Sequence, residues 1–159
     1  GALFRVSGRE SMRGVIDALA TIEREEVARC ACMLPEGNFA AGFDSGALHI
    51  YGSDGVVIDS ATLDSRVVGL ASLRGVLVAG TSTGGVQAFH DELLWDHPLE
   101  SGCEAVTTSS FRAVVVDGTG RIVSLADDGS EVAKAKFGHV TSLTCSPEGV
   151  CAAALEDGR

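Results

Sequence analysis

The sequence predicts an all-β fold of repeated four-stranded units, on two observations. Short apolar runs alternate with glycine-containing turns from one end of the chain to the other. Four of these turns recur at spacings of 38, 36 and 38 residues, marked by Gly46, Gly84, Gly120 and Gly158. A period near 40 residues is typical of a β-propeller, in which neighbouring blades bury faces that no blade buries alone. We therefore expect one domain over residues 1–159.

The first segment, residues 1–22, is expected to supply the last two strands of a blade. Residues 1–6 align with residues 46–51, which follow the marker turn of the next unit. With the four strands of a blade lettered a to d in chain order, the chain therefore begins at a strand c and continues into a strand d.

Three complete blades are expected next, at residues 27–60, 67–96 and 105–136. Each predicted strand is a short β-prone run bounded by turn residues, such as Asp44-Ser45-Gly46 in the first of these blades. The strands a to d are expected at 27–33, 38–42, 47–51 and 56–60, then at 67–72, 76–80, 86–89 and 93–96, and then at 105–109, 113–117, 121–125 and 131–136.

The last segment, residues 140–158, is expected to form strands a and b at 140–145 and 150–155. This half-blade complements the half-blade at the start of the chain, and three arrangements satisfy the pattern. The two halves close four blades within one molecule, two molecules exchange them in an eight-bladed ring with two-fold symmetry, or the chain is an excerpt of a longer propeller. Repeats of 36 to 38 residues are typical of rings with about seven or eight blades, which favours a homodimer or a larger ring.

The charge limits the partners. The chain carries 22 acidic and 12 basic residues, a formal net charge of −10. Because surfaces that bind nucleic acid are normally basic, this charge argues against nucleic acid and favours a protein or a basic peptide as partner. Apolar runs such as 76–79 and 114–116 are far shorter than the roughly 20 residues that span a bilayer, so no membrane partner is expected.

The cysteines and histidines do not predict a reaction centre. Cys30 and Cys32 share one face of a strand, and Cys145 and Cys151 lie on adjacent strands, so each is a conceivable metal-binding pair. A structural zinc site needs about four ligands, and core packing is the favoured interpretation. The four histidines lie in different repeats without a shared spacing. No catalytic residue, metal or cofactor is therefore predicted, and we do not expect an enzyme.

The cysteine count also bears on the compartment. Five cysteines is an odd number, and they are scattered among apolar neighbours. Such a pattern fits a reducing compartment better than a disulfide framework, and the first residues lack the features of a signal peptide. A cytoplasmic location is therefore expected.

The last unit contains three recognisable motifs: Gly138-His139, the strand that ends in Ser146-Pro147-Glu148-Gly149, and the turn Glu156-Asp157-Gly158. Together they resemble the first half of a WD40 repeat. This resemblance implies a propeller fold, a role in protein interaction, and a structural hydrogen-bonded network of His139 and Asp157. The Trp-Asp pair that closes strand c in that family is replaced here by Tyr51-Gly52, Phe89-His90 and Leu125-Ala126.

A second resemblance is weaker. Trp95-Asp96 falls in strand d instead of strand c, and a Trp late in strand d is similar to the pattern of quinoprotein-like propellers. Nothing in the sequence marks a quinone or metal site, so this resemblance concerns the architecture alone.

The loops at one rim of the ring are the expected binding site, because a rigid scaffold positions them together. The d-to-a loops and the b-to-c turns share that rim, which is acidic and rich in hydroxyl groups. The candidate binding residues are Glu25, Asp44, Asp64, Arg66, Thr81, Thr83, His97 and Asp157.

The leading interpretation is a non-enzymatic WD40-like propeller, or half-propeller, that serves as a protein-interaction scaffold and assembles into a closed ring. One alternative is a quinoprotein-like propeller enzyme or ligand-binding domain, which needs convergent polar groups at the mouth of the channel. The other is a purely structural module whose role is self-association, or a fragment of a larger propeller.

Overall fold

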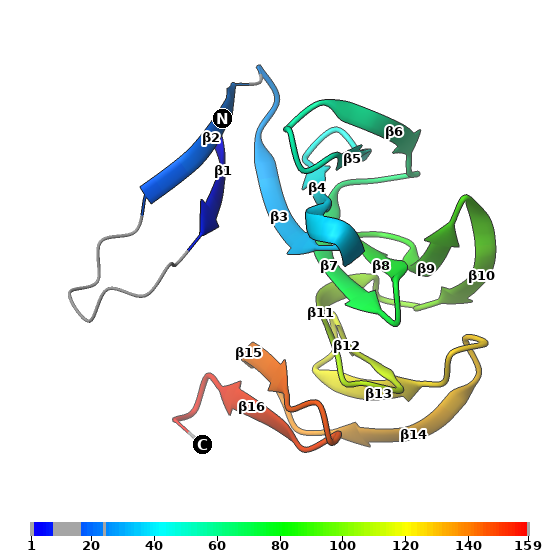
Figure 1. Ribbon diagram of the computed structural model, residues 1–159. Coiled ribbons are helices and arrows are strands. Elements are labelled where there is room, and N and C mark those ends of the chain that lie inside the picture. The colour runs from blue at the N-terminus through cyan, green and yellow to red at the C-terminus, as the bar shows by residue number, and fades with distance from the viewer. Residues whose placement is uncertain (1, 8–16, 24, 159) are drawn as a thin grey trace.

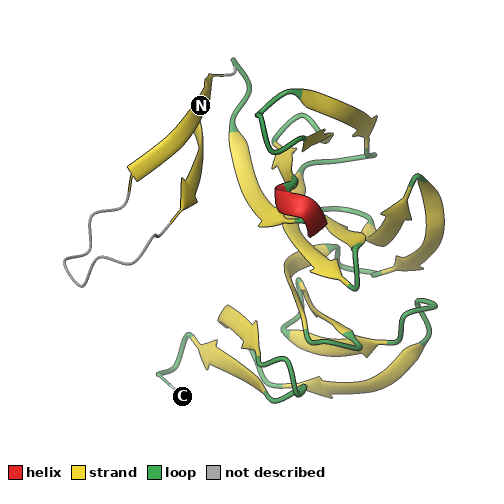
Figure 2. Ribbon diagram, in the orientation of Figure 1, coloured by secondary structure: helices red, strands yellow, loops and turns green. Residues whose placement is uncertain are grey.

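The computed structural model describes residues 2–7, 17–23 and 25–158, with side chains described from residue 25 onward. The described chain forms three four-stranded and two two-stranded antiparallel sheets, which follow one another in chain order (Figures 1 and 2). An all-β propeller architecture of three complete blades and two half-blades, as predicted, is therefore what the chain adopts. Among the described residues, no helix has the length and apolar character needed to cross a membrane.

The complete blades consist of consecutive hairpins, in the strand order a-b-c-d. Every predicted strand from residue 27 onward begins and ends within two residues of an observed one. The first blade is β3 (Ala28–Met33), β4 (Phe39–Phe43), β5 (Ala47–Tyr51) and β6 (Val57–Thr62); the second is β7 (Val67–Leu73), β8 (Val76–Thr81), β9 (Gly85–His90) and β10 (Glu92–Pro98); the third is β11 (Cys103–Thr108), β12 (Ala113–Asp117), β13 (Arg121–Leu125) and β14 (Glu131–Lys136). A short 3-10 turn, Pro35–Gly37, joins β3 to β4.

The two half-blades are separate two-stranded sheets. The N-terminal pair is β1 (Ala2–Ser7) with β2 (Asp17–Glu23), and the C-terminal pair is β15 (Val140–Cys145) with β16 (Cys151–Leu155). The two pairs lie on the same side of the molecule in Figure 1 but are not hydrogen-bonded to each other. The structure therefore does not contain the four-bladed ring closed within one molecule that was one of the predicted arrangements.

Glycine permits the recurring turn that defines the repeat. At Gly46 and Gly120 the backbone adopts φ of 88° and 75°, a left-handed conformation that side chains with a Cβ atom disfavour. Both residues end the turn between strands b and c. Gly158 adopts the same conformation, with φ of 83°, so the spacing seen in the sequence marks this backbone position in the first blade, the third blade and the C-terminal pair.

The hydrophobic core lies between the blades. Ala40, Leu48, Leu70, Leu77 and Ala79 pack where the first and second blades meet. A second cluster packs where the second and third blades meet, and includes Val78, Val86, Ala88, Val115, Val123 and Leu125. Each blade thus buries its faces only because a neighbouring blade covers them.

Close packing of the innermost strands depends on small residues. A Cβ atom on Gly69 of β7 would lie 2.9 Å from the backbone nitrogen of Val106 of β11. On Gly80 of β8 it would lie 2.5 Å from the Cys103 sulfur. The absence of a side chain at these positions lets the second and third blades approach, as required for a dense interior.

A disulfide joins Cys145 to Cys151 across the C-terminal pair. For these two cysteines, both a metal pair and core packing of free thiols are therefore wrong. Their pairing follows from the hairpin register, which places Cys145 directly opposite Cys151. The argument for a reducing compartment now rests only on the free thiols Cys30, Cys32 and Cys103, and the cytoplasmic location stays a prediction.

Candidate functional site

The turns between strands b and c are held against the adjoining d-to-a loops by backbone hydrogen bonds, which recur in the three complete blades and the C-terminal pair. On one side, the first residue of each turn donates its backbone N–H to the carbonyl oxygen of a residue before strand a. These bonds are Asp44 to Val27, Ser82 to Arg66, Gly118 to Gly102 and Glu156 to His139, at 3.0 to 3.3 Å.

On the other side, in the three complete blades, a glycine at the end of the turn accepts a bond from the following d-to-a loop. The donors are the backbone N–H groups of Leu63, Leu99 and Phe137, and the acceptors are Gly46, Gly84 and Gly120, at 2.9 to 3.4 Å. The turns and loops therefore form one continuous edge, which we call the loop rim: residues 25–27, 44–46, 63–66, 82–84, 99–102, 118–120, 137–139 and 156–158.

Two candidate residues at the start of the loop rim differ in their surroundings. The Glu25 side chain is exposed. Asp44 is bound by the Arg29 guanidinium, with 2.8 Å between Nη2 and Oδ2. The hydrogen bond from Arg29 holds the pKa of Asp44 below its ordinary value, and Arg66 contributes to the same shift. Asp44 is therefore a charged group already engaged by its own chain.

The structure brings Asp64, Thr81 and Thr83 together around a hollow of about 280 Å³, which Asp96 and Pro98 also line. Asp64 and Thr83 are exposed. Thr81, by contrast, is only 2 % exposed, and its hydroxyl faces the Gly85 carbonyl at 3.5 Å. Thr81 thus supports the turn, while Asp64 and Thr83 present groups to solvent.

Arg66 and His139 line a second hollow, of about 570 Å³, with Cys103, Glu104 and Val140. It lies where the first residues of the a strands of the second blade, the third blade and the C-terminal pair come together. His97 lies apart from both hollows, on β10 opposite Val86. There it helps to lower the pKa of Glu131, to which Lys134 is the main contributor.

His139 and Asp157 lie close together, as their proposed structural network requires, but both are exposed. They line a common hollow of about 340 Å³ with Phe137, Leu155 and Glu156. The hydrogen-bonded network implied by the WD40 resemblance therefore stays a prediction, at a position that solvent reaches.

The buried polar centre that sequence reasoning missed is Asp117, which ends strand β12 and is 0 % exposed. Its carboxylate accepts hydrogen bonds from the backbone N–H and hydroxyl of Thr119 and from the backbone N–H and Nε of Arg121, at 2.7 to 3.0 Å. Burial raises the pKa of Asp117, but the bonds from Thr119 and Arg121 outweigh it and the pKa is lowered. The available signal was an Asp between an apolar strand and a Gly-Thr-Gly turn.

The free thiols do not form a reactive or metal-binding centre. Burial raises the pKa of Cys30 to about 11 and that of Cys32 to about 12. Cys103 is buried, and burial raises its pKa to about 12. A protonated thiol is a poor ligand and a poor nucleophile. In the part of the chain that the structure describes, no group of three or more His, Cys, Asp or Glu residues could hold a metal ion.

Known structures share this architecture, although no protein-family model and no curated protein sequence matches the chain. The computationally designed Ika4 protein has a TM-score of 0.75 at 18 % identity, with 96 % of each chain covered. The WD40 repeats of RRP9 have a TM-score of 0.72 at 11 % identity, with 84 % of this chain and 52 % of that chain covered. BBS1N, solved in complex with ARL6DN, has a TM-score of 0.76 at 16 % identity, with 89 % and 52 % covered.

The fold is a WD40-like β-propeller. The four-stranded antiparallel blades and the similarity to these structures both support this fold. At these sequence identities, the similarity shows the fold alone. The chain spans about half the length of RRP9 and BBS1N and nearly all of the Ika4 protein.

Proposed function

We propose that this chain is a non-enzymatic WD40-like scaffold that binds a protein or basic peptide through its loop rim. The observation that carries the proposal is the repeated pair of backbone hydrogen bonds at the b-to-c turns of the three complete blades. Because these three turns are tethered on both sides, they present their side chains without an entropic cost of ordering loops on binding.

The charge of the rim supports a basic partner. Glu25, Asp64, Glu100 and Asp157 are exposed there, and the whole chain carries a net charge of −10. Carboxylates spread along a rigid edge attract cationic side chains, and they also accelerate encounter with a basic partner. A Lys- or Arg-rich segment is therefore the class of ligand that fits.

The rim proposal is tested with an N-acetylated, amidated hexalysine peptide and two variants of equal charge. D64N/D157N removes two rim carboxylates, and D54N/D127N removes two from the c-to-d turns at the opposite ends of the strands. The rim variant should bind about threefold to tenfold more weakly in low salt, and the control should bind as the parent does. Equal losses in both variants would contradict a site at the rim.

We also propose that a second copy of the chain completes the two half-blades, giving an eight-bladed ring. Strand b is buried throughout in the first and third blades, as β4 and β12, but its counterpart β16 consists of exposed and half-buried residues. The unpaired edges of β15–β16 and β1–β2 are complementary, because one offers strands a and b and the other offers strands c and d. Two-fold exchange satisfies both edges in each molecule.

Deletion of residues 1–22 separates assembly from rim binding. The shortened chain should lose any dimer on a sizing column and still bind hexalysine, because residues 25–158 carry the rim. The D64N/D157N variant should keep the dimer mass of the parent chain. If the deletion loses the dimer and D64N/D157N keeps it, assembly and rim binding depend on different parts of the molecule. A dimer that survives the deletion would contradict exchange of the N-terminal pair.

A further inference from the structure

The outer strands of the three complete blades contain one equivalent position with three different residues. In each blade, strand d pairs with strand c, and the register opposes Asp59 to Ile50, Trp95 to Ala88 and Ala133 to Ser124. Each pairing lies next to the same irregularity in the ladder. Asp59, Trp95 and Ala133 are therefore structurally equivalent.

Trp95 closes the outer part of the junction between the second and third blades. Its indole Nε1 donates a hydrogen bond of 2.9 Å to the Asp127 carbonyl oxygen in the c-to-d turn of the third blade. Its ring lies on Gly129 of the same turn, where an added Cβ atom would come within 2.7 Å of the indole. The ring also packs against the core cluster between these blades.

The junction between the first and second blades lacks this closure for two reasons. Asp59 takes the place of the indole, and it is exposed. The facing turn is also shorter, because three residues separate Phe89 from Leu93 in the second blade, whereas five separate Leu125 from Glu131 in the third. A hollow of about 240 Å³ results, which we call the outer socket.

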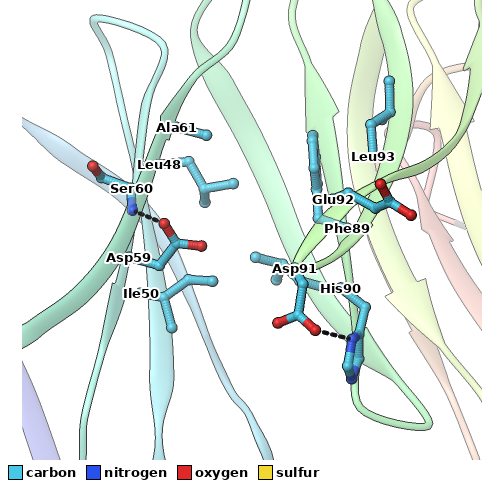
Figure 3. Close-up of a pocket in the computed structure, with 11 residues that line it drawn as sticks. Leu48, Ile50, Asp59, Ser60, Ala61, Phe89, His90, Asp91, Glu92 and Leu93 are labelled. Atoms are coloured by element: carbon cyan, nitrogen blue, oxygen red, sulfur yellow. Dashed lines mark hydrogen bonds and ion pairs between the residues drawn. The ribbon is translucent and has the colours of Figure 1, made fainter.

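The outer socket combines an apolar interior with acidic groups. Leu48 and Ile50 of β5 lie on one wall, and Phe89 of β9 lies on the other (Figure 3). Asp59, Asp91 and Glu92 also line it and are exposed. Asp59 accepts a hydrogen bond from the Ser60 backbone N–H at 2.7 Å, and Asp91 pairs with His90 at 3.2 Å.

We propose that the outer socket binds a large apolar side chain, preferably an aromatic one, from a partner peptide that carries a Lys or Arg beside it. The neighbouring junction holds an indole between the outer strands of one blade and the turn of the next, and at the socket the shorter turn and Asp59 leave the equivalent position open. The three carboxylates then pair with the flanking cation, and the apolar interior removes the anchor from water. This site is separate from the loop rim and lies toward the opposite ends of the strands.

The probe for the socket is the peptide acetyl-Lys-Trp-Lys-amide, with acetyl-Glu-Trp-Glu-amide as its charge-reversed control. Titration is followed by ¹⁵N-HSQC NMR of the full chain. The basic peptide should shift the amide resonances of residues 48–50 and 89–93, and the acidic peptide should not. Shifts confined to the loop rim, or equal shifts with both peptides, would overturn the proposal.

Two substitutions at residue 59 sharpen the test. D59W supplies the indole from within the chain and should weaken binding of the basic peptide at least about tenfold, because the anchor position is filled. A133W places the same residue at the equivalent position of the third blade and should leave binding unchanged.

D59K replaces a carboxylate of the socket by a cation while keeping the exposed position polar. It should weaken binding of the basic peptide by a similar factor. Unaltered binding by both D59W and D59K would overturn the proposal.

These variants test the proposal for the loop rim and the proposal for the outer socket independently. D64N/D157N should reduce hexalysine binding while leaving the tryptophan peptide at the socket unaffected. D59W should reduce binding of the tryptophan peptide and leave hexalysine binding unaffected. A loss of both ligands from either variant would contradict two separate sites.

Discussion

The complete third blade and the C-terminal pair contain equivalent strands in opposite surroundings. Strand β12, which is strand b of the third blade, is buried at all five residues. Strand β16, its counterpart, has exposed or half-buried residues throughout. The sequences follow the same division, since Val114, Val115 and Val116 of β12 correspond to three alanines, residues 152–154, in β16. A blade thus acquires its core only when its outer strands and a neighbouring blade are present.

The largest expected effect is on the buried carboxylate of the complete blade. Replacing Asp117 by Ala leaves the donors of Thr119 and Arg121 without their acceptor inside the structure. We expect a loss of about 3 kcal/mol in the free energy of unfolding, measured by urea denaturation. The matched surface variant D44A removes an exposed ion pair and should change stability little; equal losses would contradict a special role for burial.

A pair of truncations compares the two equivalent strands directly. V115A creates a cavity at a residue that is 0 % exposed and should cost about 2 kcal/mol. L155A removes a half-buried side chain from β16 and should cost less in dilute protein. If a second copy covers β16, the cost of L155A should rise with protein concentration, because association stabilises the folded chain. A concentration-independent cost would weaken the proposal of ring closure.

Reduction of the Cys145–Cys151 disulfide should act on the C-terminal pair alone. This bond spans a sequence separation of only six residues, so it restrains the hairpin and no larger part of the chain. We expect hydrogen exchange at β15 and β16 to accelerate on reduction, while exchange at β12 stays slow. Equal acceleration in both strands would show that the half-blade and the complete blade unfold as one unit.

The smallest effect is the acid sensitivity contributed by Asp117. Its pKa in the folded chain lies below the ordinary value of 3.8 that applies when the chain is unfolded. The unfolded chain therefore takes up a proton first as the pH falls, and this contribution to stability is present above pH 3.8 and is lost below it, toward the folded pKa. In D117N the unfolding free energy should depend less on pH below 3.8; an unchanged pH profile would contradict this assignment.

Strand positions could be predicted from the sequence because they depend on local turn chemistry. Gly46 and Gly120 supply the left-handed backbone of the same turn, and their spacing therefore marks the repeat. The exposure of His139 and Asp157 could not be predicted in this way, because burial depends on packing between strands and not on local turn residues.

The features that the sequence did not predict arise between elements. The sequence places Trp95 in strand d but does not predict what the indole contacts. Its hydrogen-bond partner, Asp127, lies in a turn of the next blade. The residues that follow Asp117 are ordinary turn residues and give no sign of its burial. That burial results from packing beyond its own hairpin. The Cys145–Cys151 pairing depends on the register, which the predicted strand ends could not fix to one residue.

The most direct test of the half-propeller account is the mass of the chain in solution, by light scattering after size exclusion over a range of concentrations. A second copy that completes both half-blades predicts a dimer, at twice the chain mass of 16.3 kDa, that dissociates when residues 1–22 are removed. A chain that stays at 16.3 kDa at every concentration would contradict the account.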